Sequence, residues 1–476
     1  MENNISQSHE PELKLNIKRT AIIGFAFFGI LLLWQVYDSW CPTFLTELFK
    51  GAFPNITNEE EVQYLVGIIM ALDNLAALIL LPIFGALSDK TKSPIGKRMP
   101  YILVGTFVCA VAFPFIPVFF HFNNIAGVIS MMAIVVIFMM MYRNPAVSLM
   151  PDMTPKPLRS KANGIINIMG YIGGAFATIV GIVFVLTDYL DQNGEGGWAA
   201  GNIWVIEIPF LLASVLMIIS CLVLFFKIKE NKIEAEIAPE MKRGEELSEL
   251  KEKVVDDKPL TRSNKIMLIL ILVAEFFWFM SDNGISTFMG NYTIYYFEAS
   301  SMSNMINTIV GGVGSVIGFA IGGIIAGKIG RKWTLVGGLG LTLLSYIVWA
   351  ILSFTLLEFA EGSKQFPLFL YFIWFIKGFG MSLVHVNSYP MVVELCNSKK
   401  IGRFTGYYYA ASMAAQTITP VALGSILLVP SFDFGILPIY ALVCLSVSFV
   451  VFLFVKNVKS TKTDFKKGLE SIGGDD

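Results

Sequence analysis

Seven ionisable residues stand inside long apolar stretches of the sequence, where a charge is costly. They are Asp38, Asp73, Arg143, Glu275, Asp282, Lys377 and His385. Placing a charged side chain at the centre of a membrane helix costs about 2.5–3.5 kcal/mol on insertion scales. Residues retained at that cost usually pair with one another or handle a substrate or an ion, so these seven are the first candidates for function.

Four of these residues, Asp73, Arg143, Asp38 and His385, are the proton-coupling candidates, with Arg143 as the pairing partner of an acid rather than as a proton carrier. Asp73 and Asn74 form a polar step in an apolar run. A carboxylate in an apolar environment holds its proton more readily, which suits a proton carrier. Arg143 should pair with Asp73 or Asp38, and protonation of the acid would then free the arginine. A static pair between helices is the alternative, and a hydrogen-bonded polar group is the alternative for His385, although a histidine titrates near neutral pH.

The composition requires that membrane helices hold these residues. Of 476 residues, 55% are hydrophobic and only 15% are charged, against about 25% charged in soluble domains. A soluble enzyme, a nucleic-acid binder and a disordered protein are therefore excluded, and the net charge of −1 gives no field that would attract polyanions. The five cysteines lie in no CxxC pair, so neither a metal site nor a cofactor is expected.

Twelve apolar stretches are long enough to cross a bilayer as helices. They cover roughly residues 20–46, 63–87, 100–120, 125–149, 160–187, 203–227, 265–296, 304–327, 333–357, 367–393, 402–428 and 434–456. The first is too long for a cleaved signal segment and should be a retained span. Of the 35 lysines and arginines, 31 fall in alternate loops and the termini. The positive-inside rule then places both termini in the cytoplasm, which predicts an integral protein of the plasma (inner) membrane.

An internal repeat divides the chain into two halves of six spans. Asp38 is followed by Thr43 and Phe44 at the same distances as Asp282 by Thr287 and Phe288. Arg143, Asp152, Lys161 and Gly164 have the same spacing as His385, Glu394, Arg403 and Gly406. We therefore expect a cytoplasmic segment (1–19), an N-terminal half (20–227), a partly helical cytoplasmic linker (228–264), a C-terminal half (265–456) and a cytoplasmic tail (457–476). Such a duplication is typical of major facilitator transporters.

The loop motifs resemble those of the glycoside–pentoside–hexuronide cation symporters, and most closely the sucrose/maltose-type branch. The resemblance rests on Gly85-Ala-Leu-Ser-Asp89 with Gly96-Lys97-Arg98-Met-Pro100, and on Arg143-Asn-Pro with Asp152. It implies an all-α major facilitator fold, with a sugar bound between the halves. Melibiose-type members carry paired aspartates just before the proline of Pro82-Ile-Phe-Gly85, and Ala77 to Leu81 hold none. This difference favours the proton over sodium as the coupling ion.

A sugar needs carboxylates, amides and aromatic faces, and the spans offer many of them. The candidates for substrate binding are Asp38, Gln35, Tyr37, Asn74, Asn167, Tyr171, Trp278, Asp282, Asn283, Asn291, Lys377, Asn387 and Gln416, with Trp34 and Tyr295 as further aromatic candidates. Each aromatic residue could instead pack against lipid or a helix. Asp38 and Asp282 could instead form an outer gate or a pair between helices, and Glu275 faces either the cavity or the linker side.

Charged residues at the cytoplasmic loop ends predict a gate. Its members are Asp89, Lys97, Arg98, Asp152, Lys161, Glu394 and Arg403, near Arg331 and Lys332. The resemblance implies that Asp89 pairs across the halves with Arg403 and latches the outward-facing state. Topology alone would explain the lysines and arginines but not the carboxylates. Elsewhere, Gly314, Gly318 and Gly322 predict a seam of close helix packing.

The sequence thus predicts a secondary active transporter that takes up a disaccharide or glycoside, of the maltose or sucrose type, with protons by alternating access. We expect it to act as a monomer in the lipid bilayer. The alternative on the same scaffold is an exporter or importer of a non-sugar solute such as a drug, a peptide or a lipid. A membrane sensor would need a larger cytoplasmic domain. An enzyme would need a cluster that His9, His121 and His385 do not form.

Overall fold

The computed structural model describes residues 13–53, 55–56, 58–190, 206–252, 262–355, 368–395 and 401–456. Within these ranges every regular element is a helix, and twelve helices are long and apolar enough to cross a membrane. This confirms the predicted all-α fold class and the number of spans. Each long helix follows from an apolar run in which only helical hydrogen bonding satisfies the backbone.

The six spans of the N-terminal half precede the linker helix. The elements are α1 (Ile17–Ala52), η1 (Glu59–Val62), α2 (Gln63–Lys90), α3 (Met99–Ala112), α4 (Phe115–His121), α5 (Ile125–Asp152), η2 (Lys156–Leu158), α6 (Arg159–Val183), α7 (Leu186–Leu190) and α8 (Glu207–Lys227). Two helix starts carry side-chain caps, since Asn16 accepts a hydrogen bond from the Arg19 amide and Asn124 from the Gly127 amide. The linker then forms α9 (Glu230–Glu252).

The C-terminal half repeats the arrangement. Its elements are α10 (Arg262–Asn291), which continues into a π-helical turn η4 (Tyr292–Tyr296), and then α11 (Ser301–Ile329), α12 (Arg331–Thr355), α14 (Leu368–Glu394), α15 (Ile401–Leu427) and α16 (Ile436–Leu453). The buried apolar side chains form two clusters, one in each half, and Met305 of α11 joins the N-terminal cluster. Each half therefore has its own apolar core.

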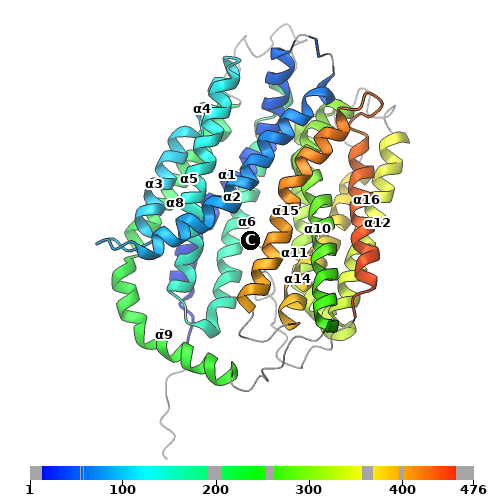
Figure 1. Ribbon diagram of the computed structural model, residues 1–476. Helices are drawn as coiled ribbons and strands as arrows, with labels where there is room; N and C mark the ends of the chain where they lie inside the picture. The colour runs from blue at the N-terminus through cyan, green and yellow to red at the C-terminus, as the bar shows by residue number, and fades with distance from the viewer. Residues whose placement is uncertain are drawn as a thin grey trace, which may run out of the picture.

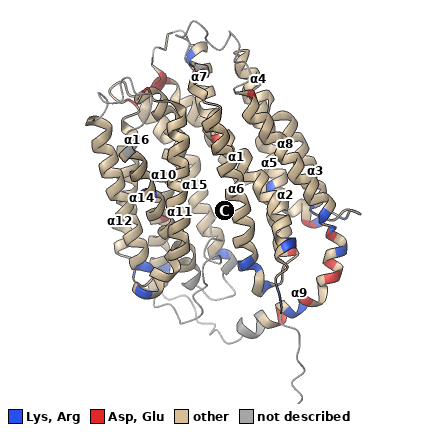
Figure 2. Ribbon diagram, turned by 180° about the vertical axis from the view of Figure 1, so that it is seen from behind, with Lys and Arg blue, Asp and Glu red and all other residues tan. Residues whose placement is uncertain are grey.

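The two halves stand side by side, and α9 crosses one end of the bundle (Figure 1). We call this the linker end and the opposite one the far end. Basic residues gather at the linker end, and α9 carries both signs of charge (Figure 2). The halves meet through α2 with α15, α6 with α11 and α1 with α10.

Glycines allow two helix pairs to approach at backbone distance. A Cβ at Gly314 would lie 2.2 Å from the carbonyl oxygen of Phe375, and those at Gly318 and Gly322 would also meet α14. This confirms the predicted seam along α11. At the far end, a Cβ at Gly67 of α2 would lie 2.2 Å from the carbonyl oxygen of Pro420 of α15. The two halves are therefore in backbone contact there.

Candidate substrate and coupling site

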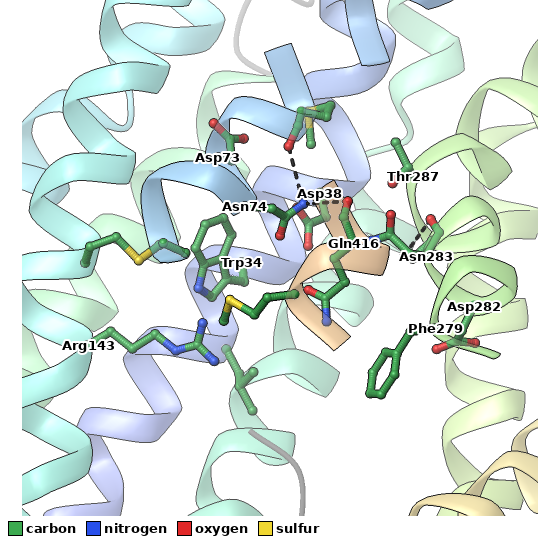
Figure 3. Close-up of a pocket in the computed structure, with 16 residues that line it drawn as sticks. Trp34, Asp38, Asp73, Asn74, Arg143, Phe279, Asp282, Asn283, Thr287 and Gln416 are labelled. Carbon is green, nitrogen blue, oxygen red and sulfur yellow. Dashed lines mark hydrogen bonds between the residues drawn. The ribbon is translucent and has the colours of Figure 1, made fainter. Parts of the chain in front are cut away.

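A polar cavity of about 320 Å³ lies between the halves. It is lined from the N-terminal half by α1, α2 and α5 and from the C-terminal half by α10 and α15 (Figure 3). Eight predicted site residues line it: Trp34, Asp38, Asp73, Asn74, Arg143, Asp282, Asn283 and Gln416. Residues more than 340 positions apart thus face one space, and Asn74 Nδ2 donates a hydrogen bond to the carbonyl oxygen of Gln416 at 3.2 Å.

The two acids of the N-terminal half have no cationic partner among the described residues. The hydroxyl of Tyr37 donates a hydrogen bond of 2.6 Å to Asp73 Oδ2, and the Tyr37 ring is fully buried. Asp38 faces the cavity and forms no hydrogen bond or ion pair with any described residue. Each acid is therefore available to a proton or a substrate in the cavity.

Arg143 corrects one expectation. It lines the same cavity but forms no ion pair with Asp38, Asp73 or any other described carboxylate. In the view of Figure 3 the Trp34 indole lies between Arg143 and Asp73. The predicted pair is absent in this conformation, because Arg143 faces the cavity, where water can solvate its charge.

The C-terminal half holds a formed ion pair. Lys377 Nζ of α14 lies 2.6 Å from Asp282 Oδ1 of α10, with the two side chains 19% and 34% exposed. The same ammonium group lies 5.7 Å from the centre of the Trp374 ring. His385, the repeat mate of Arg143, packs edge-on against Phe279 and interacts electrostatically with Asp282. Asp282 is thus held by the ammonium group of Lys377 from α14.

A second chamber of about 290 Å³ adjoins the central cavity, because both are lined by Asp38, Asp282 and Ser286. It lies between α1, α10, α11 and α14, and the predicted residues Gln35 and Lys377 contribute to its wall. Together the two chambers contain ten of the predicted site residues, with Asp38 and Asp282 common to both.

Asn291 connects the halves at the far end. Its Oδ1 accepts a hydrogen bond from Thr43, and its Nδ2 donates to Thr46 and to Gln63 Oε1, at 2.8, 2.9 and 3.0 Å. Tyr295 of η4 donates to Glu47 of α1 at 2.5 Å. Asn291 is fully buried. The far end is therefore closed by buried polar contacts between α10 and the N-terminal helices.

Residues 22–437 match the family model described as MFS/sugar transport protein. The chain belongs to this family. Among solved structures, the inward-open xylose transporter XylE from E. coli is similar with a TM-score of 0.63 at 15% identity, over 95% of this chain and 99% of that one. A D-xylose-proton symporter gives a TM-score of 0.61 at 18% identity, over 94% and 99%. A bacterial homologue of the iron transporter ferroportin gives 0.63 at 14% identity, over 92% and 99%. No curated protein matches the sequence.

These comparisons establish an integral membrane protein of the major facilitator fold, which is a transporter and not an enzyme. At such low identities the solved structures show the fold alone.

Several predicted binding residues of the transporter line neither chamber. Tyr37 and Trp278 are fully buried, Asn167 is buried in α6, and Tyr171 is 46% exposed on α6. Asn387 is buried and donates to the carbonyl oxygen of Leu383. Glu275 is buried and lines neither chamber, so it does not face the cavity.

The charged cluster at the linker end forms within the N-terminal half of the transporter. Arg98 pairs with Asp89 and with Asp152, whose Oδ2 lies 2.9 Å from Arg98 Nε, and Lys97 Nζ lies 3.2 Å from the same oxygen. Burial alone would lower the pKa of Arg98, but the two carboxylates outweigh it and raise that pKa.

Arg403, the predicted partner of Asp89 across the halves, instead donates a hydrogen bond to the Tyr407 hydroxyl. The cross-half latch of Asp89 with Arg403, expected for the outward-facing state, is not formed in this conformation. Lys161 is exposed, and the side chain of Glu394 lies outside the described residues.

Glu230, at the start of α9, completes this cluster. Its carboxylate accepts hydrogen bonds from the backbone amides of Lys97, Arg98 and Met99, at 3.1 to 3.2 Å. Burial raises the pKa of Glu230, and the three amide donors oppose that rise. The carboxylate thus caps the start of α3, where unpaired amides need an acceptor. The linker helix is therefore fastened to the N-terminal half.

Sequence reasoning missed several lining residues on α10 and α11. They are Phe279, Ser286, Thr287, Asn304, Asn307, Thr308 and Ser315. On α11, Asn304, Asn307, Thr308 and Ser315 are spaced by three, four or seven residues, which puts polar groups on one helix face. This periodicity was the signal available in the sequence.

Proposed function

We propose that the protein is a proton-coupled secondary transporter that takes up a disaccharide or glycoside by alternating access. It would act as a monomer in the plasma membrane, with the linker end and both termini in the cytoplasm. The gathering of basic residues at the linker end supports that orientation. The xylose transporter and the D-xylose-proton symporter among the similar structures support a sugar and a proton as the two solutes.

The observation that carries the proposal is the charge balance of the cavity. Its two chambers expose three carboxylates, those of Asp38, Asp73 and Asp282, and two cations, Arg143 and Lys377. Asp282 is paired with Lys377, whereas Asp38 and Asp73 share one space without an ion-pair partner. Binding one proton removes the repulsion between these two acids and leaves the cavity neutral overall, which suits a neutral polyhydroxylated substrate.

The way in which the halves meet supports alternating access. In this conformation Asn291 and the contact of Gly67 with Pro420 close the far end. The substrate and the proton would leave toward the linker end. The opposite state requires these contacts to break, and Asp89 and Arg403 would then be free to form the latch across the cytoplasmic side.

A panel of radiolabelled sugars in proteoliposomes tests the proposal, with and without an imposed proton gradient. We expect a disaccharide such as maltose or sucrose to reach a higher concentration inside the vesicles than outside only when the proton gradient is present. Accumulation driven by a sodium gradient would refute the proton as the coupling ion. Transport of peptides or drugs with no saccharide uptake would favour the alternative non-sugar cargo.

A further inference from the structure

The second chamber contains a buried amide that is left unpaired. Asn307 of α11 is 4% exposed, and neither its Oδ1 nor its Nδ2 has a hydrogen-bond partner among the described residues. It lines the chamber beside Asn304 and Thr308. Leaving a buried polar group unpaired costs about 1–3 kcal/mol, so an occupant that pairs with it binds more strongly.

The wall of the chamber leaves room for a ring. A Cβ added at Gly312 would meet nothing within 4 Å, and one added at Gly290 would meet its nearest neighbour at 3.8 Å. Both glycines line the chamber. These positions contrast with Gly314, two residues beyond Gly312, where the helices touch. The open space is therefore confined to the part of α11 that carries Asn307.

The polar groups around this space are suited to a neutral polyol. Lys377 and Asp282 already neutralise each other at its edge. Gln35 donates its Nε2 to Ser39 and keeps its carbonyl oxygen free to accept. Asn307 offers one acceptor and two donor hydrogens, and adjacent sugar hydroxyls can each donate and accept.

We propose that this chamber is a second subsite, and that the substrate is a two-ring glycoside with one ring in each chamber. Asn307 donates to one hydroxyl of the second ring and accepts from its neighbour. The shared wall of Asp38, Asp282 and Ser286 marks where the glycosidic bond passes. This inference rests on the proposed function, since it names which sugars the transporter takes.

The test compares maltose and sucrose with glucose as competitors of labelled-sugar exchange by reconstituted protein. Asn307→Leu should weaken the apparent affinity for the disaccharide about tenfold, since two neutral hydrogen bonds are lost, and leave that for glucose within about twofold. Gly312→Leu should do the same by filling the space, and it cannot disturb a contact because none exists there. Asn283→Leu, in the central cavity alone, is the matched control and should weaken both.

The possible outcomes separate the two proposals. If wild-type protein takes up a disaccharide but both α11 variants bind it unchanged, or lose glucose and disaccharide equally, the subsite is refuted and the transport function stands. If wild-type protein takes up no saccharide, both proposals fail. If Asn307→Leu protein does not fold, as judged by thermal unfolding, Gly312→Leu decides alone.

Discussion

The two halves hold equivalent aspartates in different surroundings. Asp38 on α1 and Asp282 on α10 occupy matching places in the repeat. Asp282 is paired with Lys377 at 2.6 Å, whereas Asp38 has no partner among the described residues and shares its cavity with Asp73. Arg143, the cation of the N-terminal half, stands apart from both acids.

This difference shows that the two halves of a duplicated fold can take different roles in transport. In the C-terminal half, Lys377 of α14 pairs with Asp282 and stabilises its negative charge, so Asp282 is less able to bind a proton. In the N-terminal half two acids face water without a formed ion pair, so a proton can bind and leave. One added residue, Lys377, thus makes the equivalent aspartates chemically unequal.

The largest expected effect is the loss of energy coupling when an N-terminal acid is neutralised. Asp73→Asn should reduce the inside-to-outside sugar ratio to about one, because no proton then drives accumulation, while sugar exchange continues. The hydrogen bond from Tyr37 can persist, since an amide oxygen also accepts. Uptake and counterflow in proteoliposomes measure the two properties. Glu275→Gln, at a buried acid that lines neither chamber, is the control and should keep accumulating sugar. Intact accumulation by Asp73→Asn would remove that residue from the mechanism.

The next largest effect concerns stability and compares the two cations, Lys377 and Arg143. Lys377→Ala leaves Asp282 without its partner and should lower the free energy of unfolding by about 2 kcal/mol. This is less than the usual 3–5 kcal/mol for a buried pair, because Asp282 stays 34% exposed. Adding Asp282→Asn should restore most of the loss. Arg143→Ala, which breaks no ion pair, should cost under about 1 kcal/mol in thermal unfolding, and an equal loss for the two cations would contradict the comparison.

A smaller effect is expected at the far end. Asn291→Leu leaves Thr43 and Gln63 short of a hydrogen-bond partner and should shift the population away from the closed far end about tenfold. Spin labels at the exposed positions Ala52 and Glu298 would report the change as a longer distance. Asn283→Leu, which bridges no helices between the halves, is the control. Unchanged distances for Asn291→Leu would show that the network does not hold the gate.

The smallest effect concerns the linker, which is fastened to one half only. Glu230→Ala removes the acceptor of three amides and should cost about 1 kcal/mol. Hydrogen exchange should speed up in α9 and at Lys97 to Met99 and stay unchanged in α10 to α16. Because burial raises the pKa of Glu230, ionising this carboxyl group costs more in the folded protein than in the unfolded chain. The free energy of unfolding should therefore fall as the pH rises from the ordinary pKa of glutamate through the raised value. Glu230→Gln should remove this pH dependence, and exchange that changes equally in both halves would refute the one-sided attachment.

The fold was predictable from the sequence because the bilayer imposes one rule on every span. The twelve helices followed from the apolar runs, and the seam at Gly314 from small residues four apart. The rare ionisable residues also located the cavity, since Asp38, Asp73 and Arg143 all line it.

The pairing of these residues was not predictable. Whether Arg143 forms an ion pair with Asp73 depends on the directions of side chains from two helices and on the position of Trp34. The spacing of residues in the sequence determines neither. Asn291 resembled a binding residue because its amide stands in an apolar run, and only the packing of α10 against α1 shows that it bridges the halves. Asn307 was not predicted as a site residue, because the polar residues of α11 form a stripe only when they are placed on the face of a helix.

The central claim is that the proton enters on the acids of the N-terminal half, and proton movement tests it most directly. Sugar would be added to weakly buffered proteoliposomes containing protein oriented with the linker end inside, and the external pH would be recorded. Wild-type protein and the Glu275→Gln control, whose acid lines neither chamber, should make the external solution more alkaline as sugar enters. Asp38→Asn and Asp73→Asn should abolish that change while exchange persists. An unchanged pH signal in both aspartate variants, or its loss in the Glu275→Gln variant alone, would contradict the account.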